Sequence, residues 1–190
     1  KSGTISLSTG TGRVSGGVTI CTGDSEHESG SIGISVGSSN EGSGGDLSVS
    51  AGDGATAGGK VEIASGEGDI GGGVTLQSGA GVESSGAILL NGGDSEGTGG
   101  GVRLQGGLGG SGGELLLKAG SSEDGTGGDV HIAAGASASQ VGGSATIGSG
   151  ASEGGDSGNV MLSSGSGGTS SGRIHMETGA AANRAGGVGI

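Results

Sequence analysis

Apolar and polar residues alternate over a short phrase that returns throughout the chain: a glycine, any residue, an aliphatic, any residue, an aliphatic. The phrase occurs fourteen times, at intervals of thirteen to fifteen residues. A short period kept along a whole chain indicates one structural unit copied along an axis. We therefore predict a single repeat array, residues 1–190, of fourteen copies with the last one incomplete. The copies open at Gly3, Gly16, Gly30, Gly45, Gly59, Gly72, Gly86, Gly100, Gly113, Gly128, Gly143, Gly158, Gly172 and Gly186.

The two apolar positions of a copy predict a β-strand. With the opening glycine numbered one, positions three and five are apolar in every copy, as in Val74 and Leu76, and Ala145 is the smallest of them. Apolar residues separated by one residue share a face of a strand. A helix would place them on different faces, and each of the many glycines would cost it about 1 kcal/mol.

The second half of a copy is built from small residues. Position eight is glycine in all thirteen complete copies, which predicts a positive φ or a backbone contact too close for a β-carbon. Position ten is always Gly, Ser or Ala, and all variation in length falls between it and the residue before the next opening glycine. Variation confined to one stretch indicates a surface loop, often acidic here, as in 24–28 and 121–126.

The predicted fold is all-β, a thin two-layered parallel β-solenoid with one coil of about fourteen residues per copy. Equivalent strands would lie about 4.8 Å apart, so the aliphatic residues would form two ladders along the axis. An antiparallel meander of the repeat strands satisfies the same pattern and is the alternative. Because each coil would bury little apolar surface, stability is expected to come from length and association, in a segment of a longer array.

Composition narrows the fold further. The 190 residues include 56 glycines and no Phe, Tyr, Trp or Pro. Without aromatic residues no thick core can form, and without proline the chain cannot be a collagen. Chains rich in Gly and Ser are often disordered, but the regular phase of the aliphatic residues favours an ordered repeat.

The charge and composition of the chain argue against nucleic acids and membranes as partners. Its net charge is −12, with 19 acidic and 7 basic residues. The absence of a basic patch and of aromatic residues argues against nucleic-acid binding. An acidic coat confers solubility and attracts divalent cations diffusely. No apolar run approaches the length of a membrane span, so we expect no membrane insertion.

Candidate chemical residues are few and scattered. His27 lies in a variable loop, whereas His131 and His175 occupy position four, on the face opposite the aliphatic residues, and no Ser–His–Asp set is in register. Cys21, at position six, is interpreted as an incidental thiol, with a disulfide between chains as the alternative. Acidic residues do not recur at one position, as they do in a calcium β-roll. We expect no catalytic, cofactor-binding or metal-ligating residues, and no enzyme.

The stretches 43–52 (SGGDLSVSAG) and 157–165 (SGNVMLSSG) resemble very long Gly/Ser/Thr-rich repeat proteins of algae, notably diatoms and brown algae, and similar phrases occur in phage fibre proteins. The resemblance covers the whole chain. It implies a fibrous or adhesive component that lies outside the cell or at its surface, with no catalytic residues to transfer.

The expected function is structural: a building block of an extracellular filament, appendage or surface coat that self-associates into a filament or homo-oligomer. The alternative is an adhesin stalk or a binding module that contacts divalent cations, ice or another surface. An irregular position four, which includes Glu62, Leu89 and Arg103, argues against an ice-binding face. The many Ser and Thr residues leave O-linked glycans open.

Overall fold

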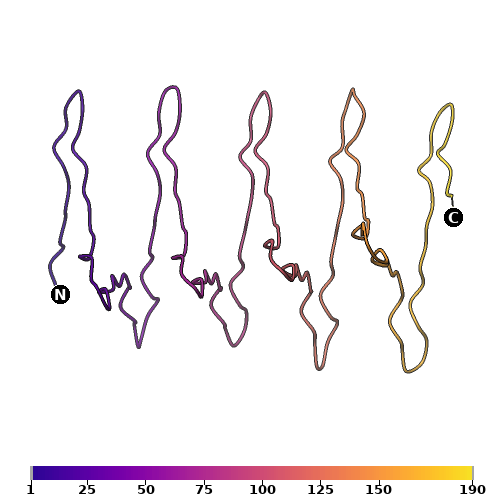
Figure 1. Ribbon diagram of the computed structural model, residues 1–190, viewed down its shortest axis with the longest axis horizontal. Coiled ribbons are helices and arrows are strands. Elements are labelled where there is room, and N and C mark those ends of the chain that lie inside the picture. The colour runs from indigo at the N-terminus through magenta and orange to yellow at the C-terminus, as the bar shows by residue number, and fades with distance from the viewer. Residues whose placement is uncertain (1, 190) are drawn as a thin grey trace. The chain divides into compact units, whose positions relative to one another are not determined.

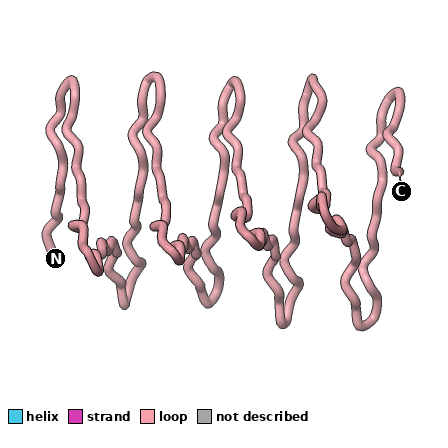
Figure 2. Tube along the Cα trace, viewed as in Figure 1, coloured by secondary structure: helices cyan, strands magenta, loops and turns pink. Residues whose placement is uncertain are grey.

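The computed structural model describes residues 2–189. Neither a helix nor a strand occurs among these residues (Figure 2). Extended stretches alternate with short bent loops (Figure 1). We call positions one to eight of a copy a segment, as in 45–52, and the residues between one segment and the next a tip, as in 53–58. The chain divides into two units, Lys1–Leu90 and Asn91–Ile190, and both are built from segments and tips.

The predicted β-solenoid is wrong, and the alternative meander is not formed either, because residues 2–189 contain no strand. A strand is defined by a ladder of hydrogen bonds to a neighbouring strand. The backbone hydrogen bonds within the described residues are instead eight single bonds, each of which closes one tip. A single bond fixes the two ends of a tip but does not continue into a ladder.

The aliphatic residues do not form a core. No residue of the described part is buried, and the chain of 17.1 kDa exposes 18884 Å². A folded monomer of this mass exposes about 7,800 Å², and its unfolded chain about 25,000 Å². The least exposed residues all occupy position seven, at the end of a segment: Ala51, Ser78, Gly106 and Ala119. The closest packing is therefore where a segment meets its tip.

The backbone bends coincide with the tips, although exposure does not distinguish tips from segments. The backbone bends within the variable stretch of each of the thirteen tips, for example over 68–70 and 123–125. In Figure 1 the chain narrows to a neck before it widens into a loop. We use neck for the point where position eight of one copy meets the opening glycine of the next.

Candidate functional site

Eight necks are closed by a backbone hydrogen bond. In each, the amide of the opening glycine donates to the carbonyl of the position-eight glycine before the tip, over 2.8 to 3.0 Å. The tip becomes a small loop whose two ends touch, like a short Ω-loop. The donor and acceptor pairs are Gly59 and Gly52, Gly72 and Gly66, Gly86 and Gly79, Gly100 and Gly93, Gly113 and Gly107, Gly128 and Gly120, Gly143 and Gly135, and Gly158 and Gly150.

The side chain at position seven distinguishes open from closed necks in all but one case. All eight closed necks have Gly, Ala or Ser at this position. Among the described residues five necks lack the backbone bond, and four of these have a β-branched residue there: Thr9, Thr22, Val36 and Thr178. The fifth has Ser164, and nothing in the structure explains why it is open.

The physical reason is the position of the γ-carbon. A β-carbon built on Gly30 would lie 3.4 Å from Cγ2 of Thr22, and one built on Gly45 would lie 2.9 Å from Cγ1 of Val36. At a closed neck the nearest side-chain atom is a β-carbon, as in Ser65 beside Gly72 at 3.3 Å. An added γ-carbon therefore holds the two backbones apart.

The prediction for the position-eight glycines is wrong. No glycine of the described part has a positive φ. A β-carbon on any of the thirteen position-eight glycines would meet nothing within 4 Å. The close approach is at the opening glycine instead: a β-carbon on Gly59 would lie 3.1 Å from Cβ of Ala51 and 3.3 Å from the amide nitrogen of Gly52.

The residue at position ten shapes the tip. All four copies of fifteen residues have serine there, and its Oγ accepts a hydrogen bond from the amide three residues later. In two copies of fourteen residues the acceptor is again serine, with the amide two residues later as donor. The pairs are Ser39 and Gly42 (2.9 Å), Ser122 and Gly125 (2.7 Å), Ser137 and Gln140 (2.9 Å), Ser152 and Gly155 (3.0 Å), Ser25 and His27 (3.3 Å), and Ser95 and Gly97 (3.0 Å).

Glycine takes this position in the shorter tips. All three copies of thirteen residues have it, and a β-carbon there would face the carbonyl oxygen two residues later, at 3.3 Å for Gly12 and 2.9 Å for Gly109. In the copy of fourteen residues that contains Gly54, the β-carbon would overlap the carbonyl of Ala57. Position ten is therefore serine in every copy of fifteen residues and glycine in every copy of thirteen, whereas copies of fourteen residues have Ser, Gly or Ala there.

The segments present an exposed apolar row, which consists of positions three and five. Within residues 2–189, and apart from Ile5 and the small Ala145, the residues at position three are 45% to 60% exposed, and those at position five 57% to 78%. Each segment thus places two aliphatic side chains side by side in solvent. Exposed apolar patches of this kind typically mark an interaction surface.

Polar side chains two residues apart contact one another on the opposite face. Nζ of Lys60 lies 2.7 Å from Oε2 of Glu62, and Nε2 of His175 lies 3.1 Å from Oε2 of Glu177. Arg103 donates from Nε and Nη2 to Oε1 of Gln105 over 3.0 and 2.7 Å. Contacts between positions four and two or six show that alternate residues share a face, as in any extended backbone. Within each described segment the apolar row therefore occupies one face, and the opposite face is mostly polar, with Leu89, Leu116 and Met161 as exceptions.

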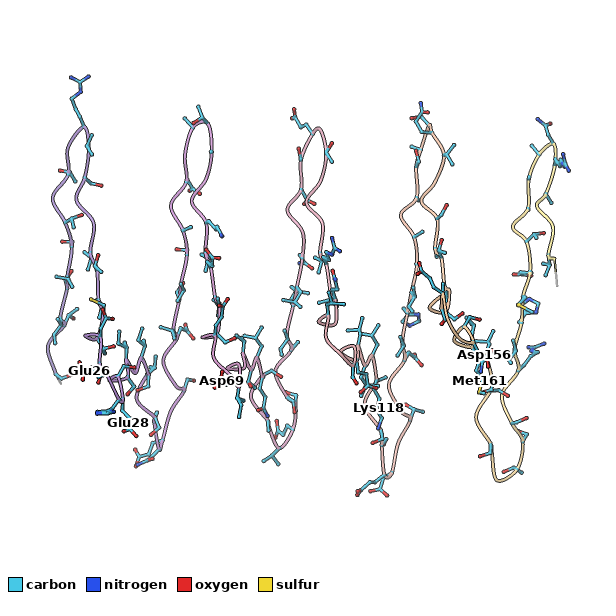
Figure 3. The ribbon with its side chains drawn as sticks, viewed as in Figure 1. Glu26, Glu28, Asp69, Lys118, Asp156 and Met161 are labelled. Carbon is cyan, nitrogen blue, oxygen red and sulfur yellow. The ribbon has the colours of Figure 1, made fainter. Side chains whose placement is uncertain are left out.

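The net charge lies in the tips. Fourteen of the 19 acidic residues are in tips, together with two of the 7 basic ones, Arg13 and Arg184. The segments contain five acidic and four basic residues and are close to neutral. Figure 3 shows Glu26 and Glu28 projecting from one tip and Asp69 and Asp156 from two others. The apolar row is thus flanked by negatively charged loops but carries almost no net charge itself.

The candidate chemical residues stay apart. His27, His131 and His175 are exposed, and the thiol of Cys21 is exposed and free. His131 lies 3.9 Å from Asp129 of its own segment. No pocket, no group of three or more residues suited to hold a metal ion and no candidate membrane-spanning helix occurs within residues 2–189.

Comparison with known proteins gives no relative. No protein-family model, no curated protein and no solved structure matches this chain.

Proposed function

We propose that this chain is a structural protein, a building block of an extracellular filament, appendage or surface coat, which associates with further copies of itself through its apolar row. The observation that carries the proposal is the exposed pair of aliphatic side chains at positions three and five, such as Val74 (52% exposed) and Leu76 (64%). The same pair recurs every thirteen to fifteen residues along the sequence, so each segment offers an equivalent apolar contact rather than an isolated apolar residue.

A second copy is the occupant that fits this surface best. Only a chain with the same period presents aliphatic pairs at matching intervals along the whole row. The near-neutral segments can approach one another without bringing many like charges together, while the acidic tips remain in water. The aliphatic side chains at positions three and five, such as Val102 (55% exposed) and Leu104 (57%), leave apolar surface for a partner to cover.

The energetics require many pairs at once. Covering one aliphatic side chain that is already half covered contributes about 1–2 kcal/mol. Association costs about 4–15 kcal/mol in lost freedom of motion. One pair cannot offset that cost, but several neighbouring pairs can, so binding between copies should strengthen steeply with the number of repeats. This dependence on length is typical of a fibre-forming array.

The test compares assembly of the chain with that of two variants. In the first, Ile63, Leu76 and Leu104, all at position five, become serine. In the control, Ala64, Gln77 and Gln105, all at position six of the same copies, become serine. Sedimentation velocity and electron microscopy over a range of protein concentrations should show assembly of the parent and of the control, and loss of assembly in the first variant. A parent chain that stays monomeric throughout, or equal loss in both variants, would overturn the proposal.

A further inference from the structure

Asn91 differs from the other asparagines in the residue that follows it. It precedes Gly92, whereas Asn40 precedes Glu41, and the remaining two precede a valine and an arginine. All four asparagines are exposed, so exposure does not separate them. Asn91 is distinguished by the glycine that follows it, because the backbone of glycine reaches conformations that other residues cannot adopt.

The surroundings of Asn91 leave its side chain and the next amide accessible. Asn91 stands at position six, on the face opposite the apolar row, so a second copy on that row would leave it in water. The amide of Gly92 donates to no acceptor among the described residues. By contrast, the amide of Gly125, which follows Asp124, is held by Oγ of Ser122 at 2.7 Å.

We propose that Asn91 is a site of spontaneous deamidation through a cyclic imide. The backbone nitrogen of Gly92 attacks Cγ of Asn91, a nitrogen–carbon bond forms, the bond from Cγ to Nδ2 breaks, and ammonia leaves with the amide proton. Water then adds to one of the two imide carbonyls. The product is aspartate or isoaspartate, and no oxidant, reductant or enzyme is required.

Deamidation at Asn91 would affect the neck between Gly93 and Gly100. A β-carbon on Gly92 would overlap the carbonyl of Gly100, and the amide of Gly100 closes the neck by donating to Gly93 over 2.8 Å. Isoaspartate inserts an extra methylene into the main chain immediately before this contact. It also places a negative charge on segment 86–93, which contains no charged residue. We therefore expect modified chains to lose the bond between Gly93 and Gly100.

Trypsin provides a test with internal controls, because cleavage after Lys and Arg places each asparagine in its own peptide: 14–60, 61–103, 119–173 and 174–184. The intact protein is kept in mildly alkaline buffer made with ¹⁸O-labelled water, sampled over days and digested. Mass spectrometry should show the peptide 61–103 losing its amide form and gaining one labelled oxygen. The other three peptides should keep their amide forms.

Two further measurements make the outcome decisive. The peptide 61–103 should yield two products, of which one is methylated by protein isoaspartate methyltransferase, and Asn91→Gln should abolish both. Equal loss of amide in all four peptides, or conversion of 61–103 in denaturant but not in the native protein, would overturn the proposal. Neither result depends on whether the chain assembles, so the proposed function is tested separately.

Discussion

Cγ2 of Thr22 lies 3.4 Å from the place where a β-carbon on Gly30 would stand, and no backbone hydrogen bond joins Gly30 to Gly23 across this neck of the described chain. At Ala51, which has no γ-carbon, the backbones on either side meet, and Gly59 donates to Gly52 over 2.9 Å. Among the described necks, a γ-carbon at position seven thus separates four of the five open necks from the eight closed ones, and the open neck at Ser164 is the exception.

We predict that Ala51→Val opens the neck between Gly52 and Gly59. An exposed hydrogen bond of this kind contributes about 0.5–1.5 kcal/mol, so exchange of the Gly59 amide with solvent should accelerate about two- to tenfold. Hydrogen exchange followed by NMR measures this directly. Ala51→Ser is the matched control, because serine stands at closed necks such as that of Ser65, and it should leave the exchange rate unchanged.

The opening and the position-eight glycines should respond differently to the same substitution. Gly59→Ala would press a β-carbon against Ala51 and Gly52, at 3.1 and 3.3 Å, and should open the neck. Gly52→Ala meets nothing within 4 Å and has no positive φ to maintain, so it should stabilise the neck by about 0.4–1 kcal/mol through the loss of chain entropy before closure. We expect the backbone amide of residue 59 to exchange faster with solvent in Gly59→Ala, and more slowly in Gly52→Ala. Equal effects would contradict the assignment of the close contact to the opening glycine.

Ser122 should hold its tip in shape, and its neighbour Ser121 should not. Ser122→Ala removes the oxygen that accepts the amide of Gly125, at a cost of about 1 kcal/mol or less because the group is exposed. Exchange at Gly125 should rise by up to about fivefold. Ser121→Ala removes a hydroxyl from the same tip without touching this bond and serves as the control. An unchanged rate at Gly125 in the first variant would show that the tip does not depend on the serine.

The local features of the fold could be predicted from the sequence because they follow from residues within one copy. The bends lie in the variable stretches, and Lys60 and Glu62 share a face, as the alternation of polar and apolar positions requires. The strands and the solenoid could not be predicted in this way. The sequence pattern of Val74 and Leu76 is the same in a buried ladder and in an exposed row. Which of the two forms depends on whether a second segment packs beside them.

The neck was missed although the sequence contains its signal. Both position eight and the opening position are glycine in every complete copy, so the sequence alone does not show that the close contact lies at the opening glycine. Position seven changes from Val36 to Ala51 between neighbouring copies, and this change separates an open neck from a closed one. The sequence also shows that every copy of fifteen residues has serine at position ten. The reason is visible only in the structure, where Oγ of Ser39 and of Ser122 accepts a backbone hydrogen bond.

Assembly should increase with ionic strength, because the tips carry the net charge of −12 while the segments are nearly neutral. At low salt the tips of neighbouring copies repel one another over a screening length of about 30 Å at 0.01 M, which falls to about 8 Å at 0.15 M. Sedimentation at a series of NaCl concentrations should therefore show assembly at a lower protein concentration as salt rises. A variant with Glu26→Gln, Glu28→Gln, Glu123→Gln and Asp124→Asn should assemble more readily at low salt and depend less on it. If salt instead dissolves the assemblies, attraction between opposite charges holds the copies together, and the apolar row is not the main contact.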